Sequence, residues 1–112
     1  QLTKSLAIAY AADGIRVNAV APGWVRTALT QTLQNDRERS AAILARTPQG
    51  RWAEPADIVG AVVFLCSPAA RFVTGVVLPV CPFQPFERFV LVIPIRVNVG
   101  NLIRTDFADF CD

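Results

Sequence analysis

Histidine and methionine are absent from the 112 residues, and lysine and tyrosine each occur once. Cysteine occurs three times, at positions 66, 81 and 111, with no Cys-x-x-Cys pair. Without histidine or closely spaced cysteines the sequence lacks the usual ligand patterns of metal sites, so we predict no metal. An odd number of widely separated cysteines also argues against a disulfide framework and favours a reducing, cytoplasmic setting.

Long apolar runs and concentrated charge are missing as well. The sequence contains no stretch of about 18 apolar residues, so it predicts no membrane-spanning helix. The first residues do not resemble a signal peptide. The net charge is only +2 and the basic residues are scattered, which favours a solvated surface over a nucleic-acid or membrane partner. Gln1 already lies within a helical pattern, so we expect the chain to begin inside a longer protein.

Hydrophobic residues, in contrast, make up 53% of the chain, whereas charged residues make up 18%, which favours one small folded domain over disorder. Apolar residues at helical spacing predict a helix over 1–12, ended by Gly14. The β-branched residues of 15–20 predict a strand, which Pro22 and Gly23 close.

Three further elements are predicted before residue 81. A weaker, polar helical stretch covers 30–45, and the strongest helical pattern covers 55–66, with proline at the first helical position. This second helix is expected to bury a broad apolar face made of Ile58, Val59, Val62, Val63, Leu65 and Cys66. Residues 76–80 form a second strand, in which Pro79 indicates an edge position or a strand end because proline has no amide donor.

Two apolar strands joined through helices predict a parallel pair. Parallel strands are normally covered by helices on both faces of the sheet. The chain has too few elements to provide that cover for an open parallel sheet. The predicted fold class is therefore α/β, as one end of a larger doubly wound parallel sheet.

Four sequence blocks carry a family resemblance. They are Leu-Thr-Lys-Ser-Leu-Ala at 2–7, Gly-Ile-Arg-Val-Asn-Ala-Val-Ala-Pro-Gly at 14–23, Arg-Trp-Ala-Glu-Pro-Ala-Asp-Ile at 51–58 and Val-Thr-Gly at 73–75. In this order and spacing they make residues 1–80 resemble the C-terminal half of the short-chain dehydrogenase/reductase family. The branch most similar includes 3-oxoacyl-carrier-protein reductases and sugar or sugar-acid dehydrogenases. The resemblance implies a C-terminal fragment of a Rossmann-type doubly wound parallel sheet, with an unmatched C-terminal tail.

The resemblance also implies a function. The family consists of NAD- or NADP-dependent oxidoreductases that transfer hydride between the nicotinamide and an alcohol or ketone, and this branch forms tetramers. Its catalytic Ser, Tyr and Lys and its glycine-rich loop would align before Gln1. Tyr10 and Lys4 do not replace them, since they stand six positions apart in the wrong order and about 120° apart around a helix.

We therefore predict no catalytic residue in the chain. The function implied is that of an NAD(P)-dependent oxidoreductase, of which this chain is an inactive fragment. The alternative is a non-catalytic interaction module that associates with full-length relatives, because a fragment with a large apolar surface favours such contacts.

The segment 22–27, Pro-Gly-Trp-Val-Arg-Thr, is the candidate cofactor site. It follows a predicted strand directly, at the carboxyl end where ligands of open α/β sheets bind. Gly23 lets the backbone turn and approach closely. The resemblance implies that backbone groups of Val25 face the nicotinamide carboxamide and that the Thr27 hydroxyl bonds the carboxamide or phosphate region. The predicted cofactor-binding residues are Pro22, Gly23, Val25 and Thr27.

Other residues receive structural roles. The polar excursion 28–50 matches the mobile substrate lid of the family, and Arg51 and Trp52 are expected to position its end. Asn18 is expected to make structural hydrogen bonds rather than to act in catalysis.

After Val80 the family pattern stops, so we divide the chain into 1–80, the C-terminal part of a Rossmann-type domain, and an unmatched tail, 81–112. The abrupt change suggests a frameshift or a fusion. The alternative is a genuine interaction tail, whose strand-like run 89–95 adds to a sheet. We also expect the uncharged run to promote aggregation, so that deletion of 81–112 would partly relieve it.

Overall fold

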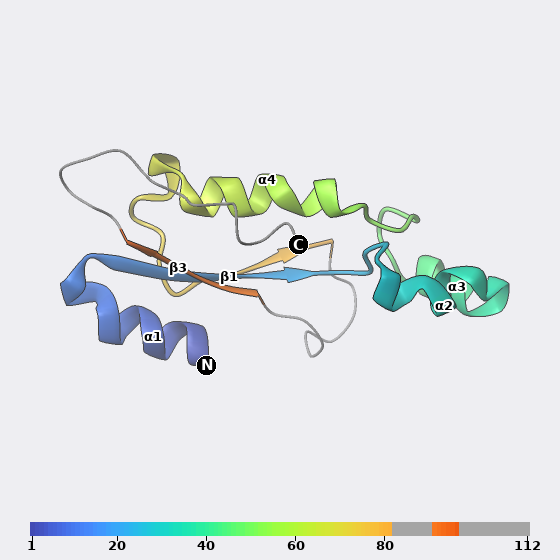
Figure 1. The fold of residues 1–112 in the computed structure, drawn as a ribbon, viewed down its shortest axis with the longest axis horizontal. Coiled ribbons are helices and arrows are strands. Elements are labelled where there is room, and N and C mark those ends of the chain that lie inside the picture. Colours follow the sequence, from blue (N-terminus) through green and yellow to red (C-terminus); the bar gives the residue numbers. More distant parts are fainter. Residues whose placement is uncertain (82–90, 97–112) are drawn as a thin grey trace.

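The computed structural model describes residues 1–81 and 91–96 of the chain (Figure 1). Its helices are α1 (Leu2–Tyr10), α2 (Gln31–Asn35), α3 (Arg37–Ala45) and α4 (Pro55–Cys66). Its strands are β1 (Ile15–Pro22), β2 (Val77–Val80) and β3 (Leu91–Arg96), and short 3₁₀ turns cover Ala11–Asp13, Ala28–Thr30 and Pro68–Ala70. None of the helices within the described ranges combines the length and apolarity that crossing a membrane requires.

The three strands form one mixed sheet in the order β2-β1-β3. β1 and β2 run parallel, with Ala19 opposite Val77, which confirms the predicted parallel pair. β3 lies within the predicted tail and pairs antiparallel with residues 15–20 of β1. Figure 1 shows α1 and α4 on opposite sides of the sheet, as in a doubly wound arrangement.

The first twenty residues follow the sequence pattern closely. α1 passes into a 3₁₀ turn, and Gly14 then adopts a left-handed conformation with φ of 67°, which a side chain would disfavour. β1 begins at the next residue and continues to Pro22, slightly beyond the predicted end.

β1 is the centre of the core, and residues 17–21 within it are buried. Asn18 is buried too, yet both ends of its amide are paired. Its Nδ2 donates to the Val73 carbonyl at 2.9 Å, and its Oδ1 accepts from the Val76 N–H at 3.2 Å. These bonds hold the segment before β2 against β1, which confirms the structural role expected for Asn18.

Arg16 places a charge in this core at the start of β1. Its Nη1 donates to the carbonyl of Leu65 at 2.9 Å and to that of Val73 at 3.1 Å. Leu65 lies in the last turn of α4, where the carbonyl oxygens carry partial negative charge. Burial lowers the pKa of Arg16 and raises the pKa of the neighbouring Cys66 thiol. The arginine thus fastens the end of α4 to the sheet.

The single helical stretch predicted over 30–45 is two helices. Asp36 separates α2 from α3 with an extended backbone conformation, φ −85° and ψ 105°. Its side chain accepts a hydrogen bond from the Arg39 N–H at 3.0 Å and so caps the start of α3. Aspartate at this position is a strong N-cap, which is why the chain restarts a helix here instead of continuing one.

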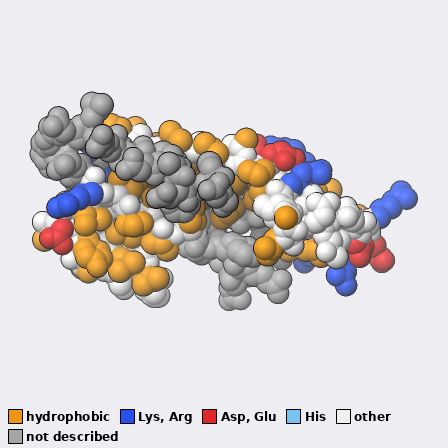
Figure 2. Space-filling view, viewed as in Figure 1, with side chains coloured by type: hydrophobic (Ala, Val, Ile, Leu, Met, Phe, Trp, Pro, Cys, Tyr) orange, Lys and Arg blue, Asp and Glu red, His pale blue; other side chains and the backbone are white. Residues whose placement is uncertain are grey.

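Of the six α4 residues that were predicted to be buried, two are exposed and two are half-buried. Only Leu65 and Cys66 are buried, whereas Val59 and Val63 expose 55% and 49% of their surface. Figure 2 shows hydrophobic side chains along the visible surface of both α4 and α1. The prediction was wrong because α4 is apolar on nearly every side, and three strands cover only one side of it.

Candidate functional site

The carboxyl ends of β1 and β2 lie side by side, because the strands are parallel and Pro22 pairs with Val80. The Gly23 N–H donates to the Val80 carbonyl at 2.9 Å. A Cβ on residue 23 would lie 2.6 Å from the carbonyl oxygen of Cys81, so glycine is needed here. The sequence predicted a close approach at Gly23, and the structure identifies Cys81 as the group that approaches it.

A cleft of about 130 Å³ opens at this edge of the sheet. Its walls come from the loop after β1, the segment before α4 and the end of β2, through Gly23, Trp24, Thr47, Gln49, Arg51, Ala53, Asp57, Val80 and Cys81. Of the four residues predicted to bind the cofactor, only Gly23 belongs to this lining. Val25 and Thr27 lie farther along the loop that starts at the cleft.

A short backbone pairing holds Val25 in place. The Arg26 N–H donates to the Ala53 carbonyl at 2.8 Å, and the Ala53 N–H donates to the Trp24 carbonyl at 2.9 Å. This pairing uses the N–H of Arg26 and the carbonyl of Trp24. The backbone N–H and carbonyl of Val25, which lies between them, therefore point to the opposite side of the chain. The Val25 carbonyl accepts from the Thr30 hydroxyl at 2.8 Å, and within 1–81 and 91–96 its N–H has no acceptor.

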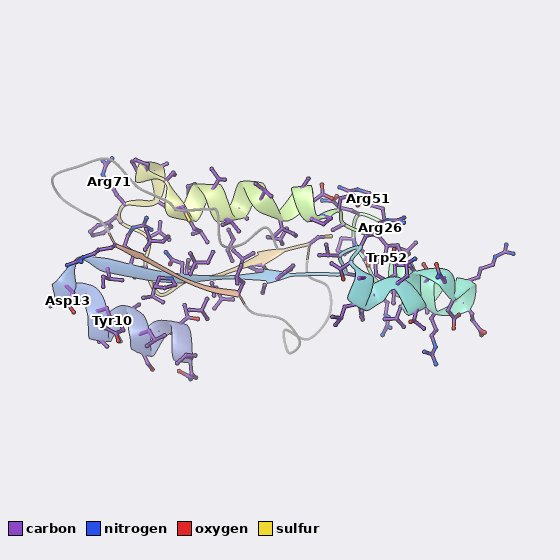
Figure 3. The ribbon with its side chains drawn as sticks, viewed as in Figure 1. Tyr10, Asp13, Arg26, Arg51, Trp52 and Arg71 are labelled. Atoms are coloured by element: carbon purple, nitrogen blue, oxygen red, sulfur yellow. The ribbon has the colours of Figure 1, made fainter. Side chains whose placement is uncertain are left out.

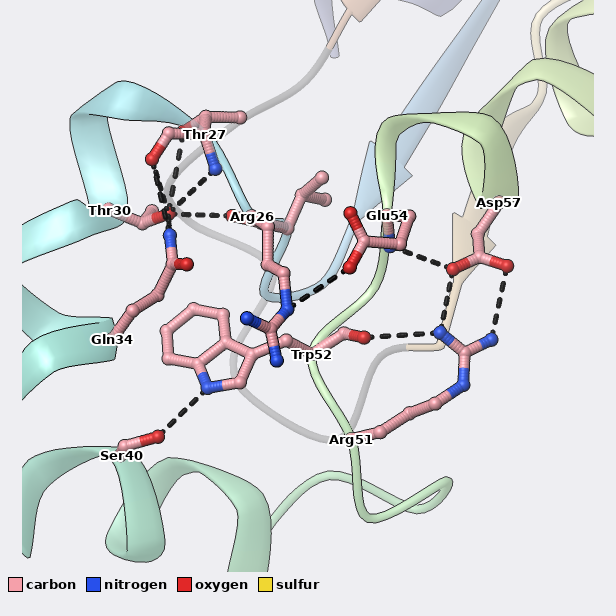
Figure 4. Close-up of polar contacts among 10 residues, drawn as sticks. Arg26, Thr27, Thr30, Gln34, Ser40, Arg51, Trp52, Glu54 and Asp57 are labelled. Carbon is pink, nitrogen blue, oxygen red and sulfur yellow. Dashed lines mark hydrogen bonds and ion pairs between the residues drawn. The ribbon is translucent and has the colours of Figure 1, made fainter. Parts of the chain in front are cut away.

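Thr27 starts the 3₁₀ turn that leads into α2 (Figure 4). Its N–H donates to the Thr30 hydroxyl oxygen at 3.1 Å, and its carbonyl accepts from the Thr30 N–H at the same distance. The Thr27 hydroxyl lies 3.4 Å from that of Thr30 and is exposed. Thr27 therefore has a capping role that the sequence did not reveal, and its hydroxyl remains accessible to a ligand.

Two tryptophans connect the loop to α3. The rings of Trp24 and Trp52 meet edge to face, with centroids 5.9 Å apart and planes at 77°. Trp52 is buried, and its Nε1 donates to the Ser40 hydroxyl of α3 at 2.9 Å. Since a buried indole N–H requires a partner, this bond ties the lid-like excursion to the edge of the sheet. The geometry agrees with the expectation that Trp52 positions the end of that excursion.

Ion pairs close the other side of the cleft. Arg51 binds Asp57 with two hydrogen bonds of 2.7 and 3.0 Å, and the Glu54 N–H donates to Asp57 at 2.8 Å. Arg26 pairs with Glu54 at 3.1 Å. The hydrogen bonds from Arg51, helped by the one from the Glu54 N–H, lower the pKa of Asp57 to about 2. The same contact with Asp57 raises the pKa of Arg51.

Asp57→Asn is expected to change the acid stability of the chain. The folded-state pKa of Asp57 lies below its ordinary value of 3.8, so the carboxylate stabilises the fold above that value. This stabilisation is lost as the pH falls toward about 2, and the amide variant lacks it throughout. The thermal midpoints of the parent and Asp57→Asn should therefore converge as the pH is lowered from about 5 to about 2.

Asp13→Asn removes a surface carboxylate at the opposite end of the molecule and is the matched control (Figure 3). Its midpoint should stay at a constant offset from that of the parent over the same range. A constant offset for Asp57→Asn as well would show that the Arg51 contact does not form in solution.

Tyr10, the single tyrosine, is not part of this site. Figure 3 shows Tyr10 on α1, at the end of the molecule away from Arg26, Arg51 and Trp52. The cleft lining therefore contains no tyrosine, and the Tyr10 side chain itself is 44% exposed.

Known proteins identify the family. A short-chain dehydrogenase model with the description enoyl-(acyl carrier protein) reductase matches residues 1–81. The 2-dehydro-3-deoxy-D-gluconate 5-dehydrogenase of Pseudoalteromonas atlantica is 53% identical to this chain over 78 residues. The chain belongs to the short-chain dehydrogenase/reductase family. The family resemblance carried by the four sequence blocks is thereby confirmed.

This short-chain dehydrogenase/reductase chain spans about a third of the length of its curated relatives. The match covers 70% of the chain but 31% of the P. atlantica enzyme. The corresponding enzyme of Bacillus subtilis is 49% identical over 79 residues, with the same two coverages. A tropinone reductase homologue of Arabidopsis thaliana is 45% identical over 80 residues, which cover 71% of this chain and 30% of the relative.

Solved structures of the family share the fold. A protein of Agrobacterium tumefaciens designated a 2-deoxy-d-gluconate 3-dehydrogenase, with bound NADP, is 53% identical with a TM-score of 0.68. One of Beutenbergia cavernae designated an NAD(P)-dependent gluconate 5-dehydrogenase, also with NADP, is 56% identical with the same TM-score. Each match covers 70% of this chain and 32% of the other. The predicted Rossmann-type α/β class is confirmed.

Proposed function

We propose that this chain supplies part of the cofactor site of an NAD(P)-dependent oxidoreductase, which transfers hydride between the nicotinamide and an alcohol or ketone. The observation that carries the proposal is the loop after β1. At the carboxyl end of a parallel strand it presents the Val25 N–H and the exposed Thr27 hydroxyl. The NADP-bound relatives support a nicotinamide dinucleotide, which would donate or accept the hydride when bound.

The predicted residues divide into those that contact the cofactor and those that hold the loop. The Val25 N–H donates to the carboxamide, and the Thr27 hydroxyl bonds the carboxamide or phosphate region. Pro22 and Gly23 fix the point where the loop leaves the sheet, through the pairing with Val80. Orienting the nicotinamide in this way brings its reactive carbon into a defined position, which is a large part of catalysis by these enzymes.

The 112 residues contain no Tyr-x-x-x-Lys motif, so the proposed oxidoreductase takes its acid–base side chains from outside this chain. We therefore propose that the chain is catalytically inactive by itself. The names of the gluconate and galactitol dehydrogenases among the relatives support a small-molecule alcohol or ketone, with sugar acids as the first class to test.

A second proposal is that the chain is an interaction module that associates with full-length relatives or with its own copies. Its support is the apolar surface on both helical layers. Leu2 and Ile8 of α1 are 64% and 79% exposed, and Val59 and Val63 of α4 are about half exposed. Apolar surface of this extent is typical of a protein–protein contact, and a homo-oligomer is the simplest form of it.

We also propose a reducing, cytoplasmic location. Its support is the state of the cysteines, since Cys66 and Cys81 are both free thiols. Cys66 is buried and unpaired, as is usual for cysteines of intracellular proteins.

The cofactor proposal is tested in a chimera in which residues 1–81 replace the matching segment of the Bacillus subtilis relative. Thr27→Ala in this chimera is expected to raise the coenzyme dissociation constant about 5- to 30-fold, which corresponds to roughly 1–2 kcal/mol. The reason is the loss of one hydrogen bond to a strongly polar ligand. Equilibrium fluorescence titration with NADH and NADPH measures it.

Two control variants separate the hydroxyl from the local structure. Thr27→Ser keeps the hydroxyl and should bind as the parent does. Thr30→Ala removes the hydroxyl that accepts from the Thr27 N–H and donates to the Val25 carbonyl, so it measures how much of the effect on binding comes from the shape of the loop alone. An unchanged constant for Thr27→Ala would show that its hydroxyl points away from the cofactor.

A further inference from the structure

The hydroxyl of Thr30 lies at the centre of a small hydrogen-bond network beside the loop after β1 (Figure 4). It donates its one proton to the Val25 carbonyl at 2.8 Å, and the Thr27 carbonyl lies farther away at 3.2 Å. It accepts from the Thr27 N–H at 3.1 Å and from Nε2 of Gln34 at 2.8 Å. A hydroxyl offers one donor and two acceptor positions, so these three bonds use all of them.

Gln34 reaches this network from α2. It stands four positions after Thr30, a spacing that brings side chains together on one face of a helical turn. The same Nε2 also donates to the Thr27 carbonyl at 3.2 Å, so both amide protons bind the loop. The side chain of Gln34 is half-buried, whereas Gln31 on the same helix is exposed and donates to Asn35 at 3.1 Å. Of the two glutamines, Gln34 is the one that holds the loop.

The Thr27 hydroxyl is left without a strong bond by this arrangement. Among the described residues its side-chain partner is the Thr30 hydroxyl, and the two oxygens are 3.4 Å apart. That distance is well beyond the roughly 2.5–3.0 Å of an ordinary bond between hydroxyls. The Thr30 oxygen does not attract the Thr27 hydroxyl proton more closely, because the Thr27 N–H and Gln34 already occupy its acceptor positions. The hydroxyl proton of Thr27 therefore stays available to a ligand.

Loss of the Gln34 donor would change this balance. One acceptor position of the Thr30 oxygen would open, and the Thr27 hydroxyl, already 3.4 Å away, could fill it after a small rotation. A Thr27 proton bonded to Thr30 is no longer available to the coenzyme. Coenzyme binding would then have to break a hydrogen bond within the protein before it makes the new one, which lowers the affinity.

We propose that Gln34 is a positioning residue of the coenzyme site, which saturates the Thr30 hydroxyl and so keeps the Thr27 hydroxyl available to the nicotinamide dinucleotide. This inference rests on the proposed cofactor function of Thr27. In this role Gln34 does not touch the coenzyme and acts through Thr30. Because Gln34 belongs to α2, the state of the Thr27 hydroxyl depends on where that helix lies as well as on the loop itself.

The test is a double-mutant cycle in the chimera with the Bacillus subtilis relative. Gln34→Met keeps the length and helix propensity of the side chain but removes both donors. It is expected to raise the coenzyme dissociation constant about three- to tenfold. In a Thr27→Ala background, which has no hydroxyl to capture, Gln34→Met should add less than about twofold. Gln31→Met makes the same change on the same helix and should bind coenzyme as the parent does.

The full chain without coenzyme tests the contact between Gln34 and Thr30. Thr30→Ala should speed the exchange of the Gln34 side-chain amide protons, measured by NMR, at least about threefold. The side-chain amide of Gln31, which donates to Asn35, should exchange at the same rate in both chains. An unchanged rate for Gln34 would show that the contact does not form in solution and would overturn the proposal.

The cycle separates this role from a structural one and from the proposed function. An equal loss of affinity in both backgrounds would mean that Gln34 only shapes the loop, and would overturn its role toward the Thr27 hydroxyl. So would an unchanged constant for Gln34→Met where Thr27→Ala weakens binding. If Thr27→Ala leaves the constant unchanged, the proposed function fails and this inference fails with it. If Gln34→Met loses its folded circular dichroism spectrum, Gln34→Asn, with an amide one methylene shorter, takes its place in the cycle.

Discussion

Assayed alone, the 112-residue chain is expected to oxidise no alcohol and to reduce no ketone with NADH or NADPH. A positioned acid–base side chain accelerates such proton transfers by about 10²–10⁴-fold, and the Tyr and Lys that the family resemblance implies would align before Gln1. Spectrophotometric assays of nicotinamide oxidation with a panel of sugar acids measure the result. The chimera with the Bacillus subtilis relative, which contains the remainder of that enzyme, is the positive control.

The decisive variant is Tyr10→Phe. Tyr10 projects from α1 at the end of the molecule away from the cleft, so its removal should affect nothing in the chimera (Figure 3). Turnover by the chain alone above a no-protein control, abolished by Tyr10→Phe, would contradict the proposal of an inactive chain.

The same assay distinguishes the two proposed functions. The chain is added in increasing amounts to the intact Bacillus subtilis enzyme. If it is only an inactive part of an oxidoreductase, the rate should stay constant. A rate that falls with added chain would favour the interaction module, because mixed oligomers would then form through the exposed faces of α1 and α4.

Local signals in the sequence predicted the elements that depend on short-range chemistry. Pro55 at the start of α4 and Gly14 after α1 each have one conformational role, and the structure shows them in it. The β-branched residues of β1 and its stop at Pro22 and Gly23 belong to the same class. Such positions are predictable because the backbone preference of one residue decides them.

The features that the sequence did not reveal depend on residues distant along the chain. The need for glycine at position 23 comes from the carbonyl of Cys81, and the bond between Trp52 and Ser40 joins residues 12 positions apart. No periodicity indicates either partner. The capping role of Thr27 is an exception, since Thr-x-x-Thr resembles a capping motif and could have been recognised.

The burial of α4 shows a different limit. Its apolar residues were expected to be buried because hydrophobic patterns usually mark a core-facing side. Pattern alone does not state how much sheet is present to cover a helix. With three strands, Val59 and Val63 stay at the surface, and a sequence of this kind predicts a face that needs a partner rather than a core.

Removal of residues 82–112 is expected to increase self-association. The sequence suggested the reverse, because the uncharged run in the tail resembles an aggregation-prone segment. In the structure that run overlaps β3, which covers the edge of β1 over residues 15–20. An unpaired strand edge, with its free backbone N–H and carbonyl groups, is a template for pairing with another chain. The tail therefore protects the sheet, and a chain of residues 1–81 loses that protection.

A chain of residues 1–96 keeps β3 and is the matched control for the loss of the rest of the tail. Loss of β3 also removes the burial of Ile95, worth about 1.5–3 kcal/mol, or roughly a tenfold or larger shift toward open states. Static light scattering at matched concentrations should show chains 1–96 and 1–112 alike and chain 1–81 associating at a concentration about tenfold lower. If chain 1–81 instead unfolds in a sharp, reversible transition that is independent of concentration, the edge of β1 needs no cover, and the tail rather than the sheet would be the source of aggregation.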